Sequence, residues 1–67
     1  MVNALVDWAT VSPEEIAALR KRLGMTQQEF AAALGTTITT ISRWENGARK
    51  PRGLYAKALE RLAKRQP

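Results

Sequence analysis

Polar side chains that can form hydrogen bonds gather on one side of the segment 37–46, TITTISRWEN. If this segment is a helix, its residues are about 100° apart, so Thr39, Arg43 and Asn46 lie about 140–200° from Ile41. Trp44 lies beside Ile41, about 300° around the same wheel. Hydroxyl, guanidinium and amide groups form hydrogen bonds with base edges and phosphates. The pattern predicts a helix with one apolar face and one face suited to binding nucleic acid.

A second short helix is predicted directly before this one. The residues TQQE at 26–29 form a capping box, in which a hydroxyl and a carboxylate satisfy the free N–H groups at a helix start. Phe30, Ala31 and Leu34 give this helix a buried face, and Gly35 ends it with a tight turn. The two helices have the layout of a helix-turn-helix over 27–46, in which the second helix enters the major groove of DNA.

Two further helices must hold this unit in place. Ser12-Pro13-Glu14-Glu15 is another capping box, and it predicts a helix that ends before Gly24. A last helix is predicted from Gly53 to about Arg65. Its expected core residues are Leu54, Tyr55, Ala58, Leu59 and Leu62. We therefore expect an all-α fold, a compact bundle of four main helices, with a domain over 12–67 and a leading segment over 1–11.

Charge is unevenly distributed along the chain, whose net charge is +5. Residues 43–67 contain eight Lys and Arg against two Glu, whereas residues 1–42 contain three basic and four acidic residues. Arg49, Lys50 and Arg52 directly follow the second helix of the motif, where backbone phosphates should run. This concentration of positive charge favours a polyanionic partner, although a solvated basic helix would show part of the same pattern.

Composition argues against several other functions. The chain has neither Cys nor His, which removes the usual zinc ligand sets and the Ser-His-Asp and Cys-His arrangements of nucleophilic catalysis. No apolar run approaches the 18 residues of a membrane span, and no secretory signal is evident. We therefore expect no enzyme activity, no metal or other cofactor, no membrane association, and a cytoplasmic location.

Two stretches, LRKRLGMTQQEFAAALG and ISRWENGARKP, resemble the phage-repressor and Cro type of helix-turn-helix, the XRE family. The resemblance covers about Ile16 to Leu62. It implies phosphate contacts from Gln27 and Asn46, and a structural ion pair between Arg20 and Glu45. It also implies that bases are read by the start and middle of the second motif helix, at Ile38, Thr39, Thr40 and Arg43.

Ile38 keeps two interpretations at this point. On the helical wheel it leans toward the apolar face, about 60° from Ile41, yet it sits at the exposed tip of the helix. It can therefore either contact a thymine methyl group or cap the core. Trp8 likewise could cover the core or contribute to a dimer.

The resemblance implies a transcriptional regulator, most often a dimeric repressor that reads a near-palindromic operator in double-stranded DNA. Many family members have a fifth helix for dimer contacts, and this chain ends at Pro67. We therefore expect a homodimer contact from Met1 to Trp8, together with Leu62. One alternative is the DNA-binding antitoxin of a toxin–antitoxin pair, with a toxin as protein partner. Another is an adapter that contacts proteins without reading DNA.

Overall fold

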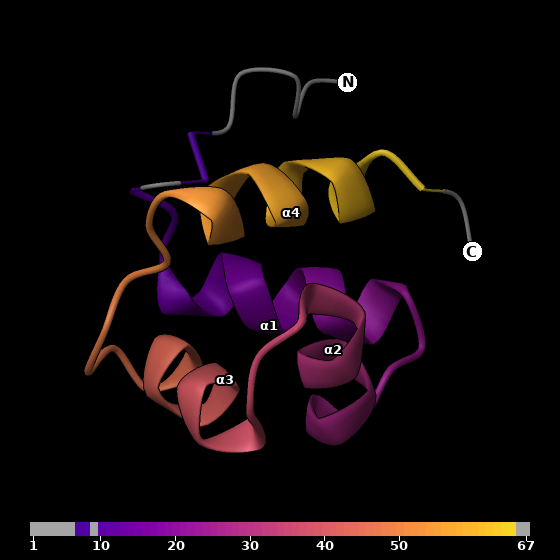
Figure 1. Ribbon diagram of the computed structural model, residues 1–67, viewed down its shortest axis with the longest axis horizontal. Helices are drawn as coiled ribbons and strands as arrows, with labels where there is room; N and C mark the ends of the chain where they lie inside the picture. Colours follow the sequence, from indigo (N-terminus) through magenta and orange to yellow (C-terminus); the bar gives the residue numbers. More distant parts are fainter. Residues whose placement is uncertain (1–6, 9, 66–67) are drawn as a thin grey trace.

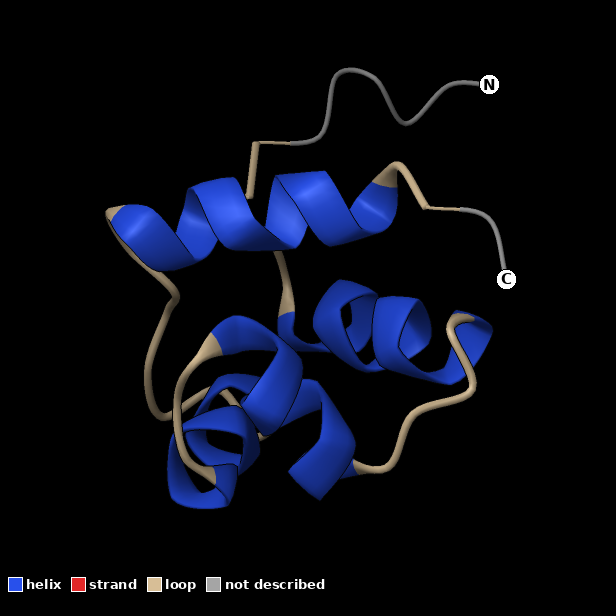
Figure 2. Cartoon of the chain, turned by 45° about the vertical axis from the view of Figure 1, so that its right-hand side comes forward, coloured by secondary structure: helices blue, strands red, loops and turns tan. Residues whose placement is uncertain are grey.

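The computed structural model describes residues 7, 8 and 10–65, and these residues contain helices but no strand (Figure 2). The helices are α1 (Pro13–Arg22), α2 (Gln27–Leu34), α3 (Ile38–Glu45) and α4 (Leu54–Ala63). The expected all-α fold of four main helices is therefore confirmed. The predicted dimer segment, Met1 to Trp8, lies outside the described residues except for Asp7 and Trp8.

Both predicted capping boxes are formed. The Ser12 hydroxyl accepts the N–H of Glu15 at 3.1 Å, and the Glu15 carboxylate accepts the N–H of Ser12 at 2.9 Å. Thr26 and Glu29 repeat this exchange at the start of α2 with the same distances. These bonds satisfy backbone donors that have no partner within the helix, so they fix where α1 and α2 begin.

The turn between α2 and α3 depends on the backbone of Gly35. This residue has φ of 73° and ψ of 32°, and its N–H bonds back to carbonyls of the last turn of α2. A Cβ atom placed there would meet nothing within 4 Å, so the left-handed backbone, rather than lack of space, favours glycine. Thr37 then caps α3 by accepting the N–H of Thr40 at 3.2 Å.

All four helices contribute to one core. In the view of Figure 1, α4 lies on one side of the molecule and the α2–α3 pair on the other. The fully buried side chains at the centre include Ile16 from α1, Phe30 from α2, Ile41 from α3 and Leu59 from α4. Because α2 and α3 bury their apolar faces on this shared core, the polar face of α3 is left on the outside.

The prediction for the start of α4 was wrong at Leu54. Its side chain is 82% exposed rather than part of the core. Leu54 precedes Leu59 by five residues, which is about 140° around a helix, so the two side chains cannot share a buried face. The helix is also slightly shorter than expected, since Gly53 is its N-cap and Lys64 its C-cap.

The segment before α1 runs beside α4 and is part of the packed structure (Figure 1). Val11 is buried in the core, and the half-buried Trp8 packs against it. Trp8 therefore covers the core, which is one of its two predicted roles. No helix among residues 7, 8 and 10–65 has the length and apolar character needed to cross a membrane.

Candidate nucleic-acid interface

The outward face of α3 carries the polar side chains that its sequence spacing predicts. Thr39, Ser42 and Arg43 are exposed, whereas Ile41 and Trp44 are buried on the opposite face. Arg43 lies in the last turn of the helix, where a cation interacts favourably with the helix dipole. The core thus holds α3 by one face and leaves a helix surface with hydroxyl and guanidinium groups free to contact a ligand.

A hydrogen-bonded network around Glu45 fixes the C-terminal end of α3. Arg20 of α1 donates from Nε to Glu45 Oε2 at 2.7 Å and from Nη2 to Oε1 at 3.1 Å. Its Nη1 also donates to the carbonyl of Met25, and Gln27 Nε2 donates to Glu45 Oε1 at 3.2 Å. The ion pair that the resemblance implies is therefore present, and it joins α1, the start of α2 and the end of α3.

The network also favours the charged forms of both partners. Burial by itself would raise the pKa of Glu45, but hydrogen bonds from Arg20 and Gln27 and the charges of Arg20 and Lys21 outweigh it and lower this pKa. The pKa of Arg20 is raised, first by its hydrogen bonds to Glu45. Glu45 is therefore ionised and paired at neutral pH, so its negative charge is not free to repel a nearby phosphate.

The basic loop after α3, residues 48–52, is held by hydrogen bonds at its start and by a buried proline near its end. The N–H groups of Ala48 and Arg49 donate to the carbonyl of Arg43 at 2.9 and 3.2 Å. Pro51 is fully buried. Because the backbone is held at these points, the side chains of Arg49, Lys50 and Arg52 are exposed beside α3.

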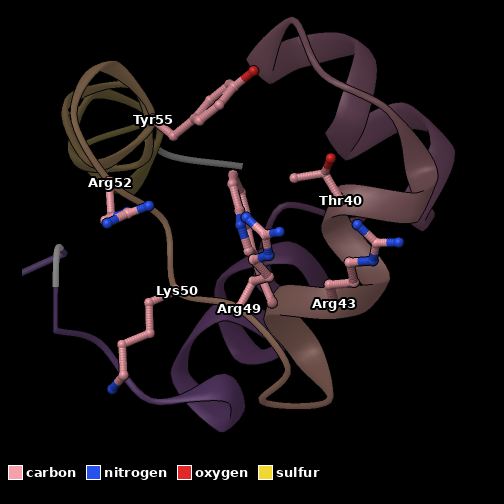
Figure 3. A pocket seen from close by; sticks show the side chains of 7 residues that line it. Thr40, Arg43, Arg49, Lys50, Arg52 and Tyr55 are labelled. Carbon is pink, nitrogen blue, oxygen red and sulfur yellow. The ribbon is translucent and has the colours of Figure 1, made fainter.

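A shallow pocket of 330 Å³ lies between α3, this loop and the start of α4. Trp44 and Tyr55 meet edge to face there, with ring centres 5.4 Å apart. Figure 3 shows Thr40 on α3 and Tyr55 on α4 on either side of the Arg49 side chain, while Lys50 extends away from the others. Among the residues that the structure describes, its lining contains no acidic side chain and consists of Thr40, Arg43, Trp44, Arg49, Lys50, Arg52 and Tyr55.

The structure brings together five of the nine predicted DNA contacts in this pocket. Gln27 lies outside this pocket, and its side-chain amide donates a hydrogen bond to Glu45. Asn46 caps α3 and uses its Oδ1 to accept the N–H of Ala48 at 3.0 Å, which leaves its amide donors for another acceptor. Phosphate binding by either residue stays a prediction.

Thr40 and Ile38 differ from the simple helical-wheel description. Thr40 is half-buried, and its hydroxyl lies 3.2 Å from that of Thr37. Ile38 is 48% exposed, so it is not one of the buried side chains that form the core. Its two predicted roles, contact with a thymine methyl group and capping of the core, both stay predictions.

Two residues that hold the fold around the interface were missed by sequence reasoning. Pro51 holds the basic loop, and Arg22 donates to the carbonyl of Ala63 at 2.8 Å, which ties α1 to the end of α4. Neither residue belongs to a periodic apolar pattern, so only a resemblance could have suggested them. Within the part of the chain that the structure describes, no cluster of three or more His, Cys, Asp or Glu could hold a metal ion.

Comparison with known proteins agrees with this geometry. A family described as helix-turn-helix matches residues 16–65. Antitoxin HigA-2 of Vibrio cholerae is 37% identical over 57 residues, which are 85% of this chain and 54% of that protein. Antitoxin MqsA of Escherichia coli K12 is 38% identical over 62 residues, which are 92% of this chain and 47% of that protein.

A type II methyltransferase of Shigella sonnei, M.SsoII, is 54% identical over 43 residues. These residues make up 60% of this chain but 11% of the methyltransferase. The chain thus spans about half the length of the two antitoxins and a small part of the enzyme. No solved structure matches the chain.

Proposed function

Because this chain belongs to the XRE/Cro-type helix-turn-helix family of DNA-binding domains, we propose that it binds duplex DNA sequence-specifically and regulates transcription. In this proposal α3 lies in the major groove, and a homodimer reads the two halves of a near-palindromic operator. Repression is the expected direction of control, and the cytoplasm is the expected location. Thr39 and Arg43 would contact base edges, while the basic loop and the amides of Gln27 and Asn46 would contact phosphates.

The observation that carries the proposal is the continuity of the α3 surface with the pocket between α3, the following loop and α4, which we call the basic pocket. Arg43 belongs to both, and Arg49, Lys50 and Arg52 extend the positive surface from the helix to the following loop. A helix in the major groove needs cations beside it, where the phosphates border the groove. The acidic residue of α3, Glu45, is paired with Arg20, so its charge is neutralised and does not repel phosphates beside the helix.

A salt titration tests the proposal. A dimer with roughly 6–8 charged phosphate contacts should give a slope of about −5 to −7 for log K against log salt concentration. Fluorescence anisotropy with a labelled duplex, first selected from a random pool, provides the measurement. Failure to bind any duplex at low salt, or binding that is independent of salt, would overturn the proposal.

The similarity to HigA-2 and MqsA favours a second candidate, in which the same DNA-binding domain acts as an antitoxin. The test uses the protein encoded beside this gene. If the chain is an antitoxin, that neighbour alone arrests growth, and co-expression of this chain relieves the arrest. Arg43→Ala should relieve it equally, because a toxin would bind away from α3. Growth that is unaffected by the neighbour would remove this candidate.

A further inference from the structure

The N-terminal tip of α3 presents an apolar surface where a DNA-reading helix meets the bases. Ile38 is the first residue of α3, and its side chain is 48% exposed. Among the described residues, Leu54 is the one other exposed large apolar side chain, and it lies on α4. Ile38 is not one of the buried residues of the core cluster, so part of its apolar surface is open to a ligand.

The hydroxyl groups around Ile38 are already engaged with one another. Thr37 accepts the N–H of Thr40 at 3.2 Å, and the hydroxyls of these two threonines lie 3.2 Å apart. This exchange satisfies one free backbone N–H at the start of the helix and uses one of the two hydroxyl protons. Ile38 therefore projects from a tip where Thr37 and Thr40 already form hydrogen bonds at the helix start, with Thr39 as the next exposed polar group.

The major groove offers few apolar groups for such a side chain. Base edges present hydrogen-bond donors and acceptors there, and the C5-methyl group of thymine is the apolar exception. An aliphatic side chain gains by covering that methyl group, whereas an unmethylated cytosine places a polar amino group and a bare C5 edge nearby. We propose that Ile38 reads a C5-methylated pyrimidine in each half-site of the operator. This inference rests on the proposed DNA-binding function.

The same geometry extends the ligand class beyond thymine. The methyl group of 5-methylcytosine occupies the same C5 position in the major groove. An apolar contact that recognises this methyl group, and not the O4 of thymine, accepts either base. The tip of α3 would then bind a C·G pair more tightly once its cytosine is methylated at C5, so DNA methylation would strengthen binding at this position.

The test is a cycle between one methyl group on DNA and one side chain on the protein. The wild-type protein first selects its preferred duplex from a random pool, and each thymine of that duplex is then replaced singly by deoxyuracil. Removing the contacted methyl should weaken wild-type binding about four-fold, the effect expected for one buried methyl group. At the same position, a 5-methylcytosine·guanine pair should bind about four-fold more tightly than a cytosine·guanine pair.

Three variants complete the cycle. Ile38→Ala should lose both differences, while Ile38→Val, which keeps a branched side chain, should retain part of each. Leu54→Ala removes the other exposed apolar side chain and should retain both in full. All affinities are measured at one salt concentration, and circular dichroism shows that each variant is folded.

The outcomes separate this inference from the function on which it rests. If the pool yields no preferred duplex, both the sequence-specific function and the reading of a methyl group are wrong. If a preferred duplex emerges but no deoxyuracil substitution weakens wild-type binding, the role of Ile38 alone is overturned. An Ile38→Ala variant that keeps the wild-type methyl preference would overturn it equally.

Discussion

The ion pair between Arg20 and Glu45 makes a quantitative prediction about stability. Their side chains are 15% and 10% exposed, so the pair lies between a surface contact worth at most about 1 kcal/mol and a buried pair whose disruption costs about 3–5 kcal/mol. Arg20→Met removes two hydrogen bonds to Glu45 and one to Met25. Glu45 keeps Gln27 as a donor and some access to water. We therefore expect a loss of about 2 kcal/mol.

Thermal and urea unfolding of the wild type, Arg20→Met, Glu45→Gln and the double variant measures this coupling. Arg20→Met and Glu45→Gln should each lower the free energy of unfolding by about 2 kcal/mol, which is a fall in Tm of roughly 8–16 °C for a domain of this size. The double variant should lose only about 2.5 kcal/mol, because each single change already breaks the pair. Arg43→Met and Glu60→Gln remove exposed charges of the same types and should change stability by less than about 0.5 kcal/mol.

Additive losses in the double variant would refute the reasoning, because they would mean that the two side chains act independently. Single variants that unfold like the wild type would refute it as well. In that case the pair would be a surface contact, and the end of α3 would be held by the burial of Trp44 and Ile41 alone.

Three further predictions follow from single positions. Because the pKa of Glu45 is lowered, its contribution to stability is fully present above the ordinary value of 4.5 and is lost as pH falls through the lower folded value. The difference in the free energy of unfolding between wild type and Glu45→Gln, measured in urea, should therefore disappear in acid. Gly35→Ala should cost about 1 kcal/mol through its left-handed backbone, and Gly35→Asn less; an equal loss for both would contradict this. Lys50→Ala should weaken operator and random DNA alike and reduce the salt slope by about 1 per monomer; Lys57→Ala, outside the basic pocket, is the control, and an unchanged slope for Lys50→Ala would remove its phosphate contact.

The helix starts were predictable because they depend on local chemistry. A capping box requires a hydroxyl and a carboxylate three residues apart, and the sequence displays both pairs directly. The turn at Gly35 is equally local. The burial of Ile41 and Trp44 followed from helical periodicity, and this periodicity also placed Arg43 and Thr39 outside.

Features that depend on tertiary packing were predicted less well. Leu54 was assigned to the core because it is apolar. Its position at the start of α4, about 140° around the helix from Leu59, places it outside the core. Val11 and Pro51 are buried in irregular segments, which have no periodicity to reveal them. The hydrogen bond from Gln27 to Glu45 joins residues 18 positions apart, so it required the folded arrangement of α2 and α3.

The central claim is that α3 reads base sequence, and Arg43 tests it most directly. The measurement is the ratio of affinity for the selected operator to affinity for random duplex, at one fixed salt concentration, for wild type and Arg43→Ala. A guanidinium on guanine contributes about 1–3 kcal/mol of discrimination, so the variant should lower this ratio by roughly 5–150-fold while binding random DNA almost as well as wild type. An unchanged ratio would contradict the account, because Arg43 would then contact phosphate and base reading would have to rest on Ile38, Thr39 and Thr40.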